Sequence, residues 1–205
     1  MLTVTEAKKI CRFDQQYKLA EELGMTDWLK YLERDTYLDE KLQVFSLLNL
    51  DKLSNQKILD IGIGLGHMGL LCKHYNHQYL GTYFGNKINQ AAPFHRDAEI
   101  DTVECGLFPQ YNKKIPSGPW DCIIMLRTTL ELNAEWTADD WRELKEECMK
   151  NLNPGGQLFI KSNLIIENTN KYGGLERLCQ ERIREAFQET PAPLWRYFTF
   201  HWIKD

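Results

Sequence analysis

The spacing of apolar residues changes near residue 56, and the two parts of the chain predict different structures. In the first 55 residues, apolar side chains recur at steps of three and four, as in Trp28, Leu29 and Leu32. That spacing places them along one face of a helix. We therefore expect residues 1–55 to form helices, which we interpret as a lid on the rest of the chain.

After residue 56, short apolar runs alternate with helical stretches. Five runs have the composition of buried strands, and they span residues 57–61, 78–84, 100–105, 121–126 and 157–164. Strands that alternate with helices are typical of a parallel sheet with helical crossovers. The pattern predicts an α/β protein with a doubly wound, mostly parallel sheet, in which residues 56–205 form one structural unit.

The clearest helix spans residues 137–152. Thr137 has the hydroxyl that caps a helix start, and Asp140 lies three residues on, where a capping box is closed. An apolar stripe predicts another helix over residues 175–187. The polar segment 167–174 separates that helix from the last strand. Because it follows a strand, we expect it to be a loop on the edge of the sheet where ligands bind.

Composition and charge exclude several classes of protein. The chain has 43% apolar and 26% charged residues, which argues against a disordered chain or a coiled coil. No apolar run approaches the ~20 residues of a membrane span, and the charged start lacks the apolar core of a signal peptide. The net charge of −4 gives no electrostatic footprint for nucleic acid. We expect a cytoplasmic protein without membrane or nucleic-acid partners.

The cysteines form no CxxC pair and have no zinc-like spacing with histidine. Most of them lie among apolar residues, so we expect buried thiols in a reducing cytoplasm and no metal site. They are Cys11, Cys72, Cys105, Cys122, Cys148 and Cys179.

The sharpest local feature is the segment KILDIGIGLGHMG at residues 57–69. A strand ends near Ile61 and a helix begins near Gly66, so the glycines form the turn between them. Glycine lets the backbone turn tightly and approach a ligand closely, and the helix start behind it favours a negative or polar group. The segment predicts a site for a nucleotide-like cofactor. We expect His67, just after the turn, to face solvent.

Three classes of cofactor compete for this turn. A Walker phosphate loop is excluded, because no Gly-Lys-Ser/Thr follows. A dinucleotide loop is an alternative, because Gly64, Gly66 and Gly69 spell GxGxxG, although that spacing alone is weak. A dinucleotide fold also needs an acid about 20 residues further on, and residues 82–84 (Thr-Tyr-Phe) supply none.

The third class is S-adenosylmethionine (SAM). The run LDIGIGLG resembles the first motif of class I SAM-dependent methyltransferases, in which an acidic residue precedes the glycines, and Asp60 holds that place. A carboxylate there suits the ammonium and sulfonium charges of SAM. Three further blocks resemble the family in order, at residues 81–92, 120–126 and 152–161. The resemblance covers residues 57–164 and implies a Rossmann-like methyltransferase fold with SAM as the cofactor.

The resemblance also implies which residues bind the cofactor. For the methionine half of SAM they are Asp60, Gly62, Gly64 and Gly66, and for the adenosine half Tyr83, Phe84, Leu107 and Phe108. Two of these positions depart from the family, which usually has an acid at Tyr83 and often one at Leu107. Loss of a charge-assisted hydrogen bond lowers affinity by about one to two decades. Three interpretations stay open: SAM in an altered pocket, a degenerate pocket in a non-catalytic protein, and a different ligand.

Methyl transfer from a sulfonium is a direct displacement, which needs alignment and exclusion of water more than a fixed catalytic motif. We therefore assign no catalytic residue. Arg127 follows the fourth strand, where it would hold an acidic group of the substrate. Residues 105–107 and 160–163 resemble strands of protein α-N-terminal methyltransferases, whose asparagine contacts the substrate amine, and this nominates Asn163. RNA 2′-O-methyltransferases use a lysine in a place similar to Lys161, but their partner acid is absent here, so we expect an ordinary strand-end lysine.

The sequence as a whole favours a SAM-dependent methyltransferase that acts on an N or O atom of a small molecule or short peptide. The alternatives are a catalytically degenerate methyltransferase-like binding partner and an NAD-type dinucleotide enzyme. The glycine turn and Asp60 count against the degenerate partner, because a disused pocket needs neither feature. Asp60 alone counts against the dinucleotide enzyme, because a dinucleotide loop does not require that acid.

Overall fold

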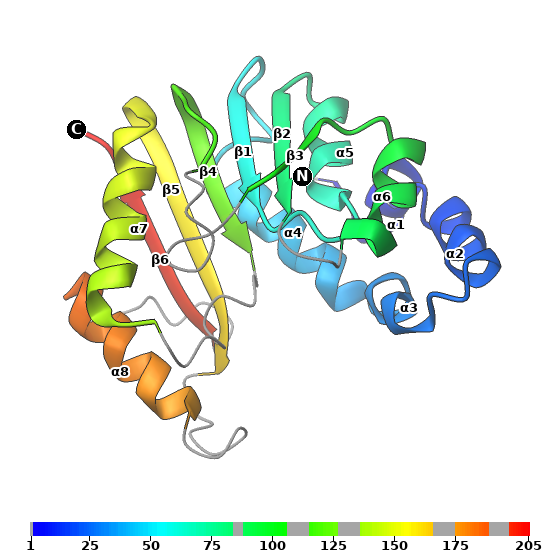
Figure 1. Cartoon of the computed structure of the whole chain (residues 1–205). Coiled ribbons are helices and arrows are strands. Elements are labelled where there is room, and N and C mark those ends of the chain that lie inside the picture. The colour runs from blue at the N-terminus through cyan, green and yellow to red at the C-terminus, as the bar shows by residue number, and fades with distance from the viewer. Residues whose placement is uncertain (1, 84–87, 106–114, 127–135, 166–174, 189–196) are drawn as a thin grey trace. The chain divides into compact units, whose positions relative to one another are not determined.

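The structure is a computed structural model of the full chain. It describes every residue except residue 1 and residues 84–87, 106–114, 127–135, 166–174 and 189–196. Within the described residues, the helices are α1 (Val4–Ile10), α2 (Phe13–Glu22), α3 (Thr26–Glu33), α4 (Asp35–Leu47), α5 (His67–His74), α6 (Ile88–Asp97), α7 (Ala138–Lys150) and α8 (Leu175–Phe187). The strands are β1 (Lys57–Ile61), β2 (Gln78–Tyr83), β3 (Thr102–Glu104), β4 (Trp120–Leu126), β5 (Leu152–Ile165) and β6 (Tyr197–Ile203) (Figure 1).

The strands are hydrogen-bonded in one sheet, in the order β3-β2-β1-β4-β5-β6. The pairs β2–β3 and β4–β5 are parallel, and the pair β5–β6 is antiparallel. The chain runs outward from β1 to β3 and then resumes beside β1 with β4, which is the doubly wound arrangement. The predicted fold class, a doubly wound and mostly parallel α/β sheet with N-terminal helices, is confirmed.

Two compact units make up the chain. The first unit contains residues 1–58 and 63–104, and the second contains residues 59–62 and 105–205. The division of the chain after residue 55 and the role of the first helices as a lid both stay predictions.

In the first unit, α1 packs against α4 and α5, and α2 packs against α3. A capping box begins α1, in which the Thr3 hydroxyl accepts from the amide of Glu6 and the Glu6 carboxylate accepts from the amide of Thr3. Because this helix has only seven residues, its stability depends on that cap and on packing, here of Ala7 and Cys11 in the core. The prediction that the first 55 residues are helical is confirmed.

In the second unit, α7 packs against α8 and against β5. The predicted capping box at the start of α7 is present between Thr137 and Asp140, and the apolar residues Trp141, Leu144 and Cys148 of this helix are buried. The Phe187 ring of α8 contacts the rings of Phe200 and Trp202 on β6, with centroids 4.8 and 4.9 Å away. Aromatic packing therefore holds α8 to the antiparallel edge strand.

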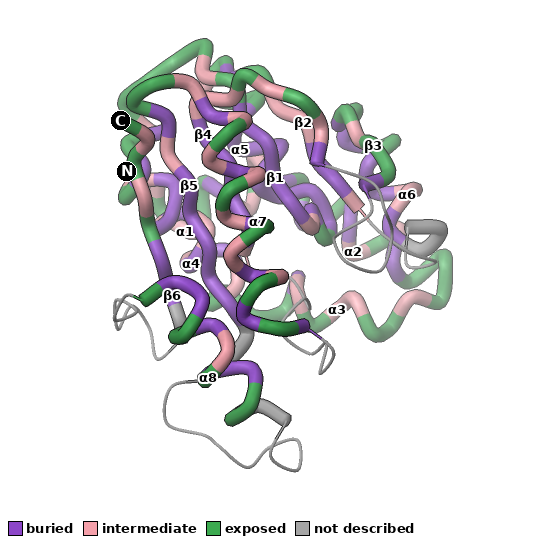
Figure 2. Tube along the Cα trace, turned by 60° about the vertical axis from the view of Figure 1, so that its left-hand side comes forward, coloured by how far each residue is buried: buried purple, intermediate pink, exposed green. Residues whose placement is uncertain are grey.

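Each apolar run predicted as a strand contains one, and the centre of β4 and much of β5 are buried (Figure 2). The third run, predicted over residues 100–105, is a strand only over Thr102–Glu104, and two of these three residues are exposed. The last run also differs, because β5 begins at Leu152 rather than at residue 157. Leu152 pairs with Trp120, and the register shifts before Cys122 pairs with Gln157. The Asn-Pro-Gly-Gly segment is therefore an irregular part of the strand, and Gly155 in it has φ +73°.

Candidate cofactor-binding site

A tight turn of residues 63–66 connects β1 to α5. The amide of Gly66 donates to the carbonyl of Ile63 at 3.1 Å, which closes the turn, and the amide of Ile63 donates to Thr82 on β2 at 3.1 Å. Gly64 has φ +57° at the first central position, a value typical of mirror-image turns, and Gly66 begins α5 with φ +82°. The predicted glycine turn between a strand and a helix is confirmed.

The glycines of this segment serve different purposes. A Cβ on Gly64 would have no heavy atom within 4 Å, whereas one on Gly66 would lie 2.6 Å from Cδ1 of Ile100. A Cβ on Gly69 would lie 2.7 Å from the ring of Tyr79. Gly66 and Gly69 therefore allow α5 to pack closely, and Gly64 leaves space beside the backbone.

Side chains from two helices bind the carbonyl groups of the turn. Nε2 of His95, on α6, lies 2.7 Å from the carbonyl oxygen of Gly64. Nε2 of Gln16, on α2, donates to the carbonyl of Leu65 at 3.3 Å. In the described part of the chain, the amides of Gly64 and Leu65 donate to no other residue. The carbonyl side of the turn is thus satisfied by the protein, and the amide side offers donors.

His67 is buried, so the expectation that it faces solvent was wrong. Its Nε2 lies 2.7 Å from Oε1 of Gln16, and its ring stacks on Phe13 with centroids 4.7 Å apart. Its backbone carbonyl accepts from the thiol of Cys11 at 3.7 Å. Residues of the N-terminal helical region therefore cover His67. The sequence around His67 gives no sign of this burial, because its partners lie more than 50 positions earlier in the chain.

Burial sets the charge of the two histidines near the turn. It lowers the pKa of His67 well below the usual value, with a smaller contribution in the same direction from Lys41. It also lowers the pKa of His95, partly opposed by the hydrogen bond to Gly64. Both rings are therefore neutral at pH 7. Because a carbonyl can only accept, the proton of His95 is on Nε2.

Asp60 lies in β1, three residues before the turn, and only 4% of it is exposed. Burial raises the pKa of the Cys122 thiol on β4, and the negative charges of Asp60 and Asp121 raise it further. Cys122 is therefore a neutral core thiol. The role of Asp60 in binding a cofactor stays a prediction.

No protein-family model and no curated protein matches the sequence. Solved structures match the fold. A methyltransferase from Pyrococcus furiosus has 16% identity over 80% of this chain and 82% of its own, with a TM-score of 0.51. Phosphoethanolamine N-methyltransferase 2 from Haemonchus contortus, in complex with S-adenosyl-L-methionine, has 17% identity over 73% of this chain and 36% of its own, with a TM-score of 0.53. A SAM-bound amino pentose methyltransferase from Micromonospora echinaspora has 19% identity over 63% and 52%, with a TM-score of 0.50.

The chain has a methyltransferase fold. At these identities the likeness is one of fold, and function depends on the chemistry of the site. In this methyltransferase fold the glycine turn follows the first strand, as the sequence resemblance implied.

Several predicted site residues lie at the edge of the described structure or beyond it. Tyr83 is the last residue of β2 and is half-buried. Asn163 lies in β5, and its side chain is outside the described residues. Also outside them are Phe84, Leu107, Phe108, Arg127 and the segment 167–174. The roles of all these residues stay predictions.

Lys161 differs most from its prediction as an ordinary strand-end lysine. It pairs with Leu126 of β4 and with Thr199 of β6, and its side chain is completely buried because β5 continues to Ile165. Burial lowers its pKa to about 7. The apolar residues before it were a signal that sequence reasoning passed over.

Other chemistry is limited in the described residues. They contain no group of three or more His, Cys, Asp or Glu side chains that could hold a metal ion. None of the described helices is long and apolar enough to cross a membrane. The six cysteines are unbridged and buried, which confirms the prediction of buried thiols.

Proposed function

We propose that this protein is a SAM-dependent methyltransferase that transfers a methyl group to an N or O atom of a small molecule or short peptide. The observation that carries the proposal is the glycine turn after β1. In a methyltransferase fold, this turn has its carbonyls bound by the protein, amides without partners among the described residues, and open space at Gly64.

The turn and β1 fit the methionine half of SAM. That half ends in a carboxylate and an ammonium group, and backbone amides at a helix start favour the carboxylate. A buried carboxylate such as that of Asp60 favours the ammonium. Gly62, Gly64 and Gly66 would let the backbone approach this half closely.

The adenosine half would lie beside Tyr83, Phe84, Leu107 and Phe108. A phenol at position 83 offers one hydrogen bond where a carboxylate offers two to a ribose. Aromatic side chains offer a stacking surface to the adenine ring. We expect binding that is weaker than in family members with the acid, and still specific.

SAM supplies a methyl group on a positively charged sulfur that leaves as a neutral thioether. The protein has to align the acceptor atom and exclude water, and it needs no covalent intermediate of its own. Arg127 and Asn163 are proposed to hold the acceptor, Arg127 by pairing with an acidic group and Asn163 by hydrogen bonding to an amine. A thiol nucleophile is not part of the proposal, because burial raises the pKa of Cys122 and of Cys148.

A second candidate is a methyltransferase-like binding partner without activity, and Tyr83 at the end of β2 favours it. An NAD enzyme is disfavoured by the same residue, because a dinucleotide fold needs an acid there. Both candidates are distinguished from the methyltransferase by what the turn binds.

Calorimetric titration of the purified protein with SAM, with its demethylated product S-adenosylhomocysteine and with NAD tests the proposal. We expect SAM and the demethylated product to bind with micromolar dissociation constants, and NAD not to bind. A folded protein that binds neither SAM nor the product contradicts the proposal, and binding of NAD alone favours the dinucleotide enzyme.

A further inference from the structure

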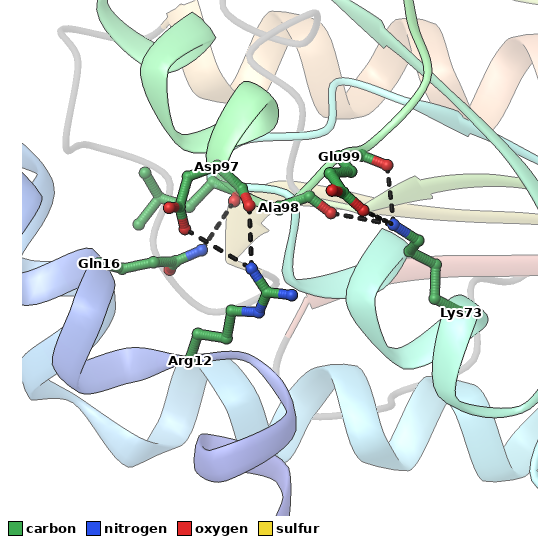
Figure 3. A network of polar contacts seen from close by, with 7 residues as sticks. Arg12, Gln16, Lys73, Asp97, Ala98 and Glu99 are labelled. Atoms are coloured by element: carbon green, nitrogen blue, oxygen red, sulfur yellow. Dashed lines mark hydrogen bonds and ion pairs between the residues drawn. The ribbon is translucent and has the colours of Figure 1, made fainter.

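The first helices of the chain are attached to the elements around the glycine turn. Arg12, at the start of α2, donates to the backbone carbonyl of Asp97 at 2.9 Å, at the end of α6. Lys73 of α5 donates to the carbonyls of Ala98 and Glu99 at 3.1 and 2.9 Å. Figure 3 shows both cations directed at this one stretch of backbone, with Gln16 beside Arg12. Both α2 and α5 are thereby hydrogen-bonded to the backbone at the end of α6.

Gln16 is a buried amide that contacts the turn directly. Only 1% of this residue is exposed. Its two polar atoms are both used, because Nε2 donates to the Leu65 carbonyl and Oε1 lies 2.7 Å from Nε2 of His67. A carbonyl can only accept, so the amide orientation is determined and His67 must be the donor to Oε1. The two hydrogen bonds therefore run in one direction: His67 donates to Gln16, and Gln16 donates to the Leu65 carbonyl.

His95 holds the peptide group in the middle of the same turn. The carbonyl of Gly64 and the amide of Leu65 belong to one trans peptide, so they point in opposite directions. When His95 binds that carbonyl at 2.7 Å, it also fixes the direction of the Leu65 amide, away from itself. Gln16 acts on the next peptide, whose amide belongs to Gly66 and closes the turn on Ile63.

We infer that Gln16 and His95 are positioning residues, which orient the peptide groups of the glycine turn so that its amides are presented to the cofactor. The inference rests on the proposed function for the identity of that cofactor. It makes helix α2 a part of the cofactor site through its contact with the turn. Neither residue needs to touch the ligand.

The test measures binding of S-adenosylhomocysteine by calorimetry to His95→Leu and Gln16→Met, which remove the donors at similar size. Losing a hydrogen bond to a buried carbonyl is expected to weaken binding about tenfold or more. Matched controls are His74→Leu and Gln15→Met, which replace exposed residues of the same types and should bind like wild type. Circular dichroism establishes that each variant is folded.

Folded His95→Leu and Gln16→Met proteins that bind with the affinity of wild type overturn the inference. If either variant does not fold, Gln16→Glu and His95→Gln take its place. Gln16→Glu keeps the acceptor for His67 and loses the donor to Leu65, so it should bind S-adenosylhomocysteine more weakly than wild type. His95→Gln keeps a side-chain donor for the Gly64 carbonyl, so it should bind more tightly than His95→Leu. The opposite pattern in these two variants also overturns the inference.

A measurement without ligand separates this inference from the proposed function. Hydrogen exchange of the Leu65 and Gly66 amides should be faster in His95→Leu and Gln16→Met than in wild type and in the two controls. Unchanged exchange contradicts the positioning role, whatever the protein binds. Wild-type protein that binds neither SAM nor its product, but shows the faster exchange in the variants, contradicts only the proposed function.

Discussion

Replacing Lys161 with methionine should change how the stability of the protein depends on pH. Lys161 is completely buried in β5, and burial lowers its pKa to about 7. The unfolded chain has a lysine pKa of about 10.4. Between these values the unfolded state binds a proton that the native state does not, so stability rises with pH in this window. Below about pH 7 the unfolding free energy is lowered by the full cost of burying a charged lysine, and above about pH 10.5 this cost disappears.

The size of the effect follows from a difference of one proton. In the middle of the window this gives a slope of about 1.4 kcal/mol in unfolding free energy per pH unit. From pH 8.0 to 9.5, wild type should gain about 2 kcal/mol relative to Lys161→Met, since all other titrating groups are shared. Methionine fits the site because it is apolar and unbranched.

The assay is urea denaturation followed by tryptophan fluorescence, at pH 8.0, 8.75 and 9.5. A matched control is Lys150→Met, which replaces an exposed lysine at the end of α7 and should run parallel to wild type. Parallel curves for wild type and Lys161→Met would refute the reasoning, because they would mean that the buried amine keeps an ordinary pKa.

Three further predictions concern the turn, strand β2 and the thiols. Gly64→Arg should abolish SAM binding in calorimetry, because its side chain would fill the open space beside the turn, and it should also lower the melting temperature, because φ is +57° there. Gly66→Ala should lower the melting temperature through its φ of +82° and its contact with Ile100. Retained binding in folded Gly64→Arg would place the cofactor elsewhere. Tyr83→Asp should tighten SAM binding or leave it unchanged, and a large loss would mean that the phenol makes a specific contact. The native protein should react slowly with a thiol reagent at pH 8, because all six thiols are buried and burial raises the pKa of Cys11 to about 12; rapid labelling of any cysteine contradicts this placement.

Local patterns in the sequence predicted those parts of the fold that have local causes. The strands β1 and β4 are buried runs of apolar residues, which period and composition reveal directly. Helix α7 begins at Ala138, directly after its N-cap Thr137, because its capping box is complete within four residues. The glycine turn was equally visible, because positive φ values at Gly64 and Gly66 need glycine.

The residues that were wrongly predicted depend on distant parts of the chain. His67 is buried because Phe13 and Gln16 cover it from a helix more than 50 positions earlier. Lys161 is buried because β4, β5 and β6 align around it. The expected substrate residues Arg127 and Asn163 could be nominated from the resemblance alone, since their side chains have no local pattern that reveals a ligand.

The long separations of the bonds that hold the glycine turn have a consequence for how the protein folds. The hydrogen bond across the turn joins residues only three apart, but those from His95 and Gln16 connect residues 31 and 49 positions apart. Short loops close within about 100 nanoseconds, while contacts of long separation form late because of the entropy lost in bringing them together. The turn therefore acquires its final shape only after α2 and α6 have docked. Protection of the Leu65 and Gly66 amides during refolding should lag behind the recovery of helical signal, and would serve as a marker of the completed first unit.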